Sequence, residues 1–300
     1  SNENNRVDEE KISLLPSDER RTRGTCCGGI RDEFHLRNIF LEYEGNEAVF
    51  YSSQWHCPAA VFVVYRVVAA TYITAWLLVT ALGLEHGIVR YPWPVWLTNW
   101  SYLLLSLHLI LAAILAVQAT WQDGGFHCCG RQQTFNLLPS TLDTAFTVRH
   151  RLPWYVKIDW VLFNIVCLAA FTVTLVYFIG LYPQMGAFKP PLIEDINLHG
   201  MNLVVVVLEL ILGAVPVRLL HVVYPILYGL VYTIFSLIYW SGDHTRILYP
   251  KILDWNHPGT TATIIAGLLL VGAPLLQTVI FTIYKLKLCV YRRIYTCRMN

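Results

Sequence analysis

The chain has 300 residues, of which 55% are hydrophobic and 14% are charged, and its mean hydropathy is +0.47. This composition lies well outside the range of ordinary soluble globular proteins. The formal net charge of +2 leaves no basic stripe that could neutralise a run of phosphates, so we expect no nucleic-acid partner.

Residues 1–58 are polar and lack the apolar segment of a cleavable signal peptide. We expect them to form a cytoplasmic N-terminal tail, disordered over residues 1–34, where the apolar surface is too small to fold. Six apolar runs follow, each with about the 20 residues that a helix needs to cross a bilayer. They occupy residues 59–85, 96–120, 154–181, 196–214, 219–240 and 260–286. The sequence therefore predicts an all-α fold, a polytopic membrane protein in which residues 59–286 form a bundle of six transmembrane helices and residues 287–300 form a cytoplasmic tail.

The distribution of positive charge predicts the orientation of this bundle. The two tails and the second and fourth loops share one side and hold 16 of the 22 lysines and arginines, whereas the other side holds 4. Cytoplasmic loops carry the excess of positive charge, so both termini are predicted to be cytoplasmic. Seven of the 8 cysteines fall on that side and Cys167 lies within a span, which leaves none for a disulfide in the outer loops. We expect an integral protein of the plasma membrane or the endoplasmic reticulum.

Ionisable residues inside the spans are costly in a membrane and need partners or a function. Arg66 lies about two turns into the first span, at a depth that Asp159 and Glu209 can reach from other spans. We predict an Arg66–Glu209 pair that acts as a structural clamp. A proton or ion relay through His108, Glu209 and Asp159 is the alternative.

The second and fourth spans also carry polar residues at their outer ends. His199, Asn202 and Glu209 fall within an arc of about 80° on one helical face, and Thr98, Ser101 and His108 do the same. Because Thr98 and Asn99 lie at the depth of His199, we expect a pocket in the exoplasmic half. Its predicted residues are Thr98, Asn99, Ser101, His199 and Asn202, with His244 and His257 from the outer loop before the sixth span.

A hydroxyl beside an imidazole is the minimum for nucleophilic catalysis, which makes Thr98 and His199 the candidate catalytic pair. The same residue types also join helices by hydrogen bonds alone, and the spacing leaves both readings open. No G-x-S-x-G, H-E-x-x-H or phosphate-binding glycine motif is present, so we predict no metal and no cofactor. The adjacent cysteines Cys26–Cys27 and Cys128–Cys129 lack zinc-ligand spacing, and with Cys289 they are either palmitoylation sites or ordinary thiols.

Three stretches of the chain resemble the rolling stone family of multi-pass membrane proteins. They are residues 96–101 (WLTNWS), 196–202 (INLHGMN) and 239–240 (YW) followed by 249–255 (YPKILDW). The resemblance covers roughly residues 35–290, including the order of the spans. It implies a membrane protein that interacts with lipids or with a protein partner in the membrane, because the family is named for an insect protein involved in myoblast fusion.

A more distant resemblance links the chain to the androgen-induced membrane hydrolases, which cleave fatty-acid esters of hydroxy fatty acids. It implies an intramembrane threonine, matched by Thr98, and a histidine in an N-H-G-M-H stretch, which here reads NLHGMN over residues 197–202. Asn202 stands where the resemblance implies the catalytic histidine, and an amide cannot act as a general base. His199, His244 or His257 would then have to act as the general base. The sequence thus predicts an interaction or fusion protein, with a lipid-ester hydrolase and a small transporter or channel as alternatives.

Overall fold

The computed structural model describes residues 33–43, 45–83, 92–122, 152–185, 192–250 and 252–296. Five helical stretches in these ranges are long and apolar enough to cross a membrane. They are α4 (Ala59–Ala81), α5 (Leu97–Gln122), α6 (Trp154–Leu175) with η4 (Val176–Leu181) and η5 (Tyr182–Gln184), η8 (Leu219–Val222) with α9 (Val223–Ser241), and α10 (Pro258–Gly267) with η9 (Leu268–Gly272) and α11 (Ala273–Thr296). The predicted all-α polytopic fold is confirmed.

The fourth predicted span corresponds to a shorter apolar helix. After α7 (Leu192–Asp195), the π-helical stretch η7 (Ile196–Gly200) and α8 (Met201–Leu212) complete it. The helix ends two residues before the predicted boundary at 214, while α11 continues to Thr296, well into the predicted C-terminal tail. Most of the N-terminal stretch predicted to be disordered lies outside the described residues, as do Cys26, Cys27, Cys128 and Cys129.

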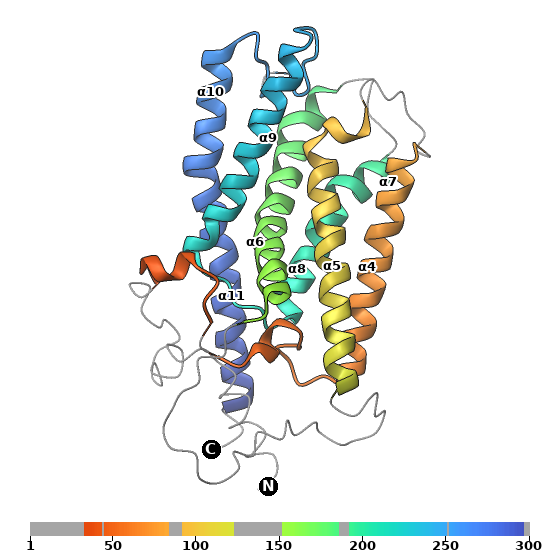
Figure 1. Ribbon diagram of the computed structural model, residues 1–300, viewed down its shortest axis with the longest axis vertical. Coiled ribbons are helices and arrows are strands. Elements are labelled where there is room, and N and C mark those ends of the chain that lie inside the picture. The colour runs from red at the N-terminus through yellow and green to blue at the C-terminus, as the bar shows by residue number, and fades with distance from the viewer. Residues whose placement is uncertain are drawn as a thin grey trace, which may run out of the picture.

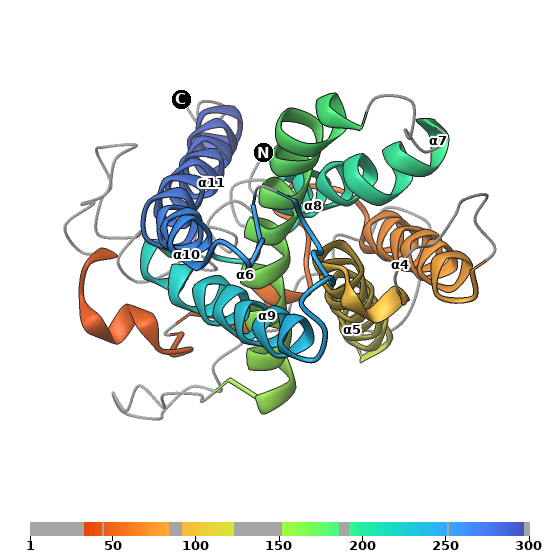
Figure 2. The ribbon, with the colours of Figure 1, turned by 90° about the horizontal axis from the view of Figure 1, so that it is seen from above.

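The helices alternate in direction (Figure 1). We call the end where α4 begins and α11 ends the base, and the end where α5 begins and α9 ends the top. Figure 2, seen along the bundle, shows α6 at the centre, with α4 and α5 on one side and α10 and α11 on the other. Helix α6 packs against α5, α8, α9 and α11, which agrees with its central place in the bundle.

Proline and glycine residues explain where α4 and α6 begin and where α4 ends. Pro58 and Pro153 precede α4 and α6, where a proline's missing amide proton leaves no helical hydrogen bond unmade. Helix α4 ends before Gly83, whose φ of 67° lies in the left-handed region that favours glycine. The predicted first span, 59–85, is therefore shorter as a helix, and residues 84–91 lie outside the described ranges.

The chain between α8 and η8 is not helical, although it lies inside the protein. Non-helical backbone at membrane depth is tolerated where other groups bind its carbonyls. Lys287 Nζ donates hydrogen bonds to the carbonyls of Leu210 (2.9 Å) and Gly213 (2.7 Å). Trp160 Nε1 donates to the carbonyl of Pro216 at 2.8 Å. Gln277 Nε2 donates to the carbonyl of Arg218 at the other end of this stretch, and Gln54 N, Ser53 Oγ and Trp55 Nε1 donate to the last carbonyls of α8.

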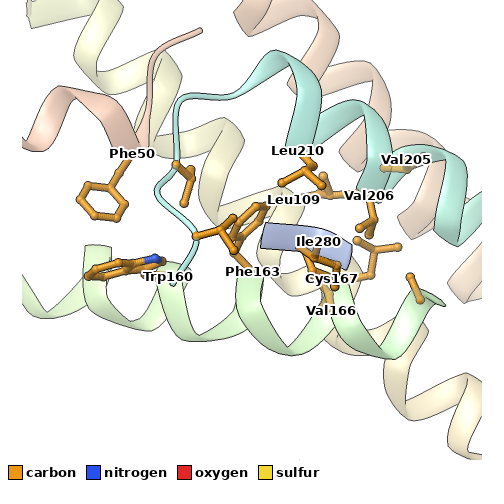
Figure 3. Close-up of a cluster of buried hydrophobic side chains, with 14 of the residues drawn as sticks. Phe50, Leu109, Trp160, Phe163, Val166, Cys167, Val205, Val206, Leu210 and Ile280 are labelled. Carbon is orange, nitrogen blue, oxygen red and sulfur yellow. The ribbon is translucent and has the colours of Figure 1, made fainter. Parts of the chain in front are cut away.

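The hydrophobic core is centred where α5, α6, α8 and α11 meet (Figure 3). Leu109, Phe163, Leu210 and Ile280 come from these four helices, and each is at most 2% exposed. Phe50, in the short helix η2 (Glu47–Phe50), is fully buried against Trp160, with ring centroids 5.0 Å apart. Part of the predicted N-terminal tail is therefore packed into the base of the bundle.

Candidate functional site

Thr98 lies in the first turn of α5, at the top of the bundle, and its side chain is half-buried. The neighbouring amide of Leu97 donates a 2.9 Å hydrogen bond to the hydroxyl of Tyr249, which belongs to the connection between α9 and α10. Desolvation raises the pKa of Tyr249 above its ordinary value, so the phenol stays neutral. Thr98 is thus placed against the α9–α10 connection.

Asn99 and Ser101 form hydrogen bonds within the protein that give each of them a structural role. Asn99 is buried and donates to the carbonyl of Trp93 at 2.7 Å, which fixes the chain entering α5. Ser101 Oγ donates to the carbonyl of Leu97 at 2.9 Å and lies 3.0 Å from the hydroxyl of Tyr228 in α9. Both residues hold α5 in place at the top.

His199 lies in η7, where the helix adopts π geometry, and it faces η4, a second π-helical stretch. Its imidazole stacks on the ring of Tyr177 with a centroid distance of 3.4 Å and an interplanar angle of 2°. Thr174 Oγ1 donates to the carbonyl of His199 at 2.5 Å. Single π-helical turns are rare and frequently occur at functional sites.

Asp195 is a residue that the sequence analysis missed. Its Oδ1 lies 3.7 Å from His199 Nδ1, and it accepts a hydrogen bond from the Tyr177 hydroxyl. The side chain of Asp195 is 1% exposed and that of His199 is 13% exposed. The four-residue spacing of Asp195 and His199, which brings two side chains to one helical face, was the signal available in the sequence.

The other predicted pocket residues have separate surroundings. Asn202 is buried, and its Oδ1 accepts from Thr174 Oγ1 (3.2 Å) and from the amide of Leu203 (2.6 Å), so it ties α8 to α6. His244 is exposed and stacks on Trp240 at 4.2 Å, and His257 is exposed just before α10. Within the described ranges, no hydrogen bond or ring contact joins His199 to Thr98, His244 or His257.

The base of the bundle holds two buried ionisable pairs. Arg66 Nη2 lies 3.1 Å from Glu209 Oε2, which is the pair preferred from the sequence, and the two side chains are 0% and 2% exposed. Arg66 Nη1 also donates to the carbonyl of Ala112 at 3.2 Å. His108 Nδ1 lies 2.8 Å from Asp159 Oδ1, with both side chains 1% exposed. Asp159 therefore pairs with His108 rather than with Arg66.

The described residues contain no group of three or more His, Cys, Asp or Glu side chains that could hold a metal ion. Of the cysteines in those ranges, Cys167 is buried, Cys289 is half-buried and Cys57 is exposed. The functional groups that the arrangement offers are carboxylates, imidazoles and hydroxyls. Between η4 and η7, the His199 imidazole beside Asp195 keeps part of its surface accessible.

Comparisons with known proteins give one consistent result. The profile of the family described as "Protein rolling stone" matches residues 24–298. The chain is 27% identical to Protein rolling stone of Drosophila melanogaster over 273 residues, which cover 87% of this chain and 90% of that protein. No solved structure matches the chain.

Proposed function

Because the chain belongs to the rolling stone family of membrane proteins, we propose that it acts at the plasma membrane as an interaction protein in cell–cell fusion. In this proposal both termini are cytoplasmic and the top of the bundle faces the outside of the cell. The charge distribution of the loops supports this orientation. The family match over residues 24–298 supports the role, and the form of the top surface supports a mechanism by recognition.

The observation that carries the proposal is the folded connection between α9 and α10, residues 242–250 and 252–257. Asp243 accepts hydrogen bonds from the amide (3.0 Å) and the hydroxyl (2.8 Å) of Thr245, and Asp254 accepts from the amide of Asn256 at 3.0 Å. The Asn256 side chain in turn donates to the carbonyl of His244 at 3.2 Å. These local bonds give the connection a defined shape, which reduces the ordering cost of binding a partner.

The same connection is fixed to the bundle and presents charge at its surface. Trp255 Nε1 donates to Ser236 Oγ in α9 at 3.1 Å, and the Leu97 amide donates to Tyr249. Asp243 and Arg246 are exposed and lie 3.5 Å apart. The hydrogen bonds from Thr245 hold the pKa of Asp243 below its usual value, so the surface keeps a carboxylate beside a guanidinium. A polar partner on an apposed membrane fits this surface.

A content-mixing assay tests the proposal. Two cell populations that both express the full chain carry complementary halves of a split luciferase, and luminescence reports fusion. We expect the Asp243→Ala/Arg246→Ala double variant to lower content mixing by half or more at equal surface expression, because both exposed charges are lost. Arg293→Ala, exposed at the base, is the matched control and leaves mixing unchanged. Mixing no greater than that of cells lacking the chain would refute the proposal.

Hydrolysis of a lipid ester is the second candidate function, with His199 as the general base that activates the attacking water. The specific observation in its favour is the carboxylate of Asp195 beside the half-buried imidazole of His199. Purified protein is incubated with a lipid ester and turnover is compared with that of His199→Ala. Turnover that disappears in the variant supports this candidate, and fusion that survives in the same variant separates it from the first.

A further inference from the structure

At the top of the bundle, the geometry points to Asp195 and Tyr177 as residues that position His199 for proton transfer. This inference rests on the second candidate function, lipid-ester hydrolysis, and names the residues that act on the histidine. Tyr177 and His199 lie in stretches that depart from α-helical geometry, η4 (Val176–Leu181) and η7 (Ile196–Gly200), and Asp195 is the last residue of α7, directly before η7. The two distorted stretches face each other, which brings Tyr177 and His199 into contact.

Tyr177 has two contacts in this cluster. Its ring lies parallel to the imidazole of His199 at 3.4 Å, which fixes the plane of the imidazole. Its hydroxyl donates a hydrogen bond to Asp195 Oδ1, which fixes the carboxylate. One side chain therefore sets the position of both members of the Asp195–His199 pair.

The carboxylate faces one particular nitrogen of the imidazole. Asp195 Oδ1 lies 3.7 Å from His199 Nδ1, longer than a hydrogen bond but within reach of electrostatic attraction. In catalytic sites without substrate, such distances are often long and shorten when substrate binds. A carboxylate beside Nδ1 favours the tautomer with its proton on that nitrogen, which leaves Nε2 as the proton acceptor.

The burial of the ring agrees with this assignment. His199 Nδ1 is buried and has no hydrogen-bond partner in the described part of the chain. The side chain as a whole is 13% exposed, so its exposed surface belongs to the rest of the ring. Asp195 is buried behind it at 1% exposure, where it can orient the imidazole without meeting a substrate itself.

Neighbouring apolar side chains indicate the class of substrate. Ile179 in η4 is 73% exposed, and Ile193 and Ile196, on either side of Asp195, are 69% and 43% exposed. In a membrane protein these side chains face lipid, and an acyl chain can lie along them. The substrate class is therefore an amphiphilic ester whose acyl chain stays in the membrane while its ester group reaches His199.

The reaction that this arrangement supports needs only water as the second reactant. His199 Nε2 takes a proton from water as the water oxygen attacks the acyl carbon, and a C–O bond forms. The ester C–O bond then breaks, and His199 returns the proton to the departing alkoxide. One ester and one water give one carboxylic acid and one alcohol, and no proton passes to Asp195.

The first test measures the nucleophilicity of His199 directly, in the full chain and without a substrate. Diethyl pyrocarbonate reacts with the unprotonated imidazole nitrogen, and mass spectrometry of the His199 peptide gives the rate. We expect Asp195→Asn to slow this reaction several-fold, because the amide can donate to Nδ1 and move the ring proton to Nε2. Tyr177→Phe keeps the ring and loses the hydroxyl, so a smaller decrease is expected.

Thr174→Val is the matched control, because Thr174 bonds the carbonyl of His199 and not its ring. We expect it to leave the diethyl pyrocarbonate rate unchanged. An equal rate in the parent chain and Asp195→Asn would overturn the inference. An equal decrease in Asp195→Asn and Thr174→Val would overturn it as well, since the effect would then be a general loss of structure.

The second test uses hydrolysis of a fluorogenic lipid ester by the same variants in detergent micelles. Asp195→Asn is expected to lower kcat about a hundredfold, the scale of a general-base contribution, and to leave KM unchanged. Unchanged kcat in this variant would overturn the positioning role while leaving hydrolysis intact. If the parent chain cleaves no ester, the hydrolase function fails, and the histidine reactivity still decides the positioning role.

Discussion

The base and the top of the bundle both bury polar side chains, but they do so in different ways. At the base, Arg66 and Glu209 are 0% and 2% exposed and come from regular α-helices. At the top, His199 is 13% exposed and comes from a π-helical stretch. The comparison teaches that burial of an ionisable side chain does not by itself distinguish one end of the bundle from the other. Access to the group and departure from regular helix geometry separate the two ends.

The largest effect is expected from breaking the pair at the base. Arg66→Met leaves Glu209 as an uncompensated buried charge, and we expect a loss of about 3–5 kcal/mol in the free energy of unfolding. The measurement is unfolding in mixed micelles by a graded denaturing detergent. The Arg66→Met/Glu209→Leu double variant is the control and should recover most of the loss. If the double variant is as unstable as the single one, the pair is not what stabilises the base.

The next effect concerns the non-helical stretch after α8. Lys287→Met removes two charge-assisted hydrogen bonds, to the carbonyls of Leu210 and Gly213, and should cost about 1.5–3 kcal/mol. Lys285→Met, two residues earlier, is the control, because Lys285 is 24% exposed and lies 3.8 Å from Glu33. Its loss should stay below about 1 kcal/mol. Equal losses in the two variants would show that the carbonyl contacts contribute little.

The sequence predicted the base better than the top, for a physical reason. Arg66 and Glu209 lie in regular helices, so depth counted at a constant rise per residue brings them together, and the structure pairs them. Near His199 the helix is π-helical, and each such turn shifts the residues after it around the axis. Constant spacing placed His199, Asn202 and Glu209 on one face. In the structure His199 and Asn202 contact α6 and η4, whereas Glu209 contacts Arg66 in α4.

The helix boundaries also show what the sequence pattern can and cannot predict. The apolar pattern gave all six helical regions, because hydrophobicity alone determines which runs can face lipid. It could not show that α8 ends at Leu212, since Gly213 and Val215 are as apolar as the helix before them. That end depends on Gly213, where an added Cβ would lie 2.8 Å from the carbonyl oxygen of Glu209, and on Lys287, far along the chain.

A smaller effect is expected at the top. Thr174→Val removes the hydroxyl whose one proton is shared between the His199 carbonyl and Asn202 Oδ1, while keeping the shape of the side chain. The cost should be about 1 kcal/mol, the usual net contribution of a neutral hydrogen bond. The same detergent titration measures it, with Thr172→Val as the control, because the Thr172 hydroxyl donates to the Leu168 carbonyl within α6. A loss of unfolding free energy as large as that of Arg66→Met would mean that the polar contacts at the top stabilise the fold as much as those at the base.

The smallest effect is expected from an arginine that matches Arg66 in chemistry but not in exposure. Arg246 lies 3.5 Å from Asp243, and its side chain is 42% exposed. Water and salt screen such a pair, and holding two mobile side chains together costs conformational entropy. Arg246→Gln should therefore leave the unfolding midpoint unchanged at low and at high ionic strength. A salt-dependent drop would show that this surface pair stabilises the top, and burial would no longer distinguish the two arginines.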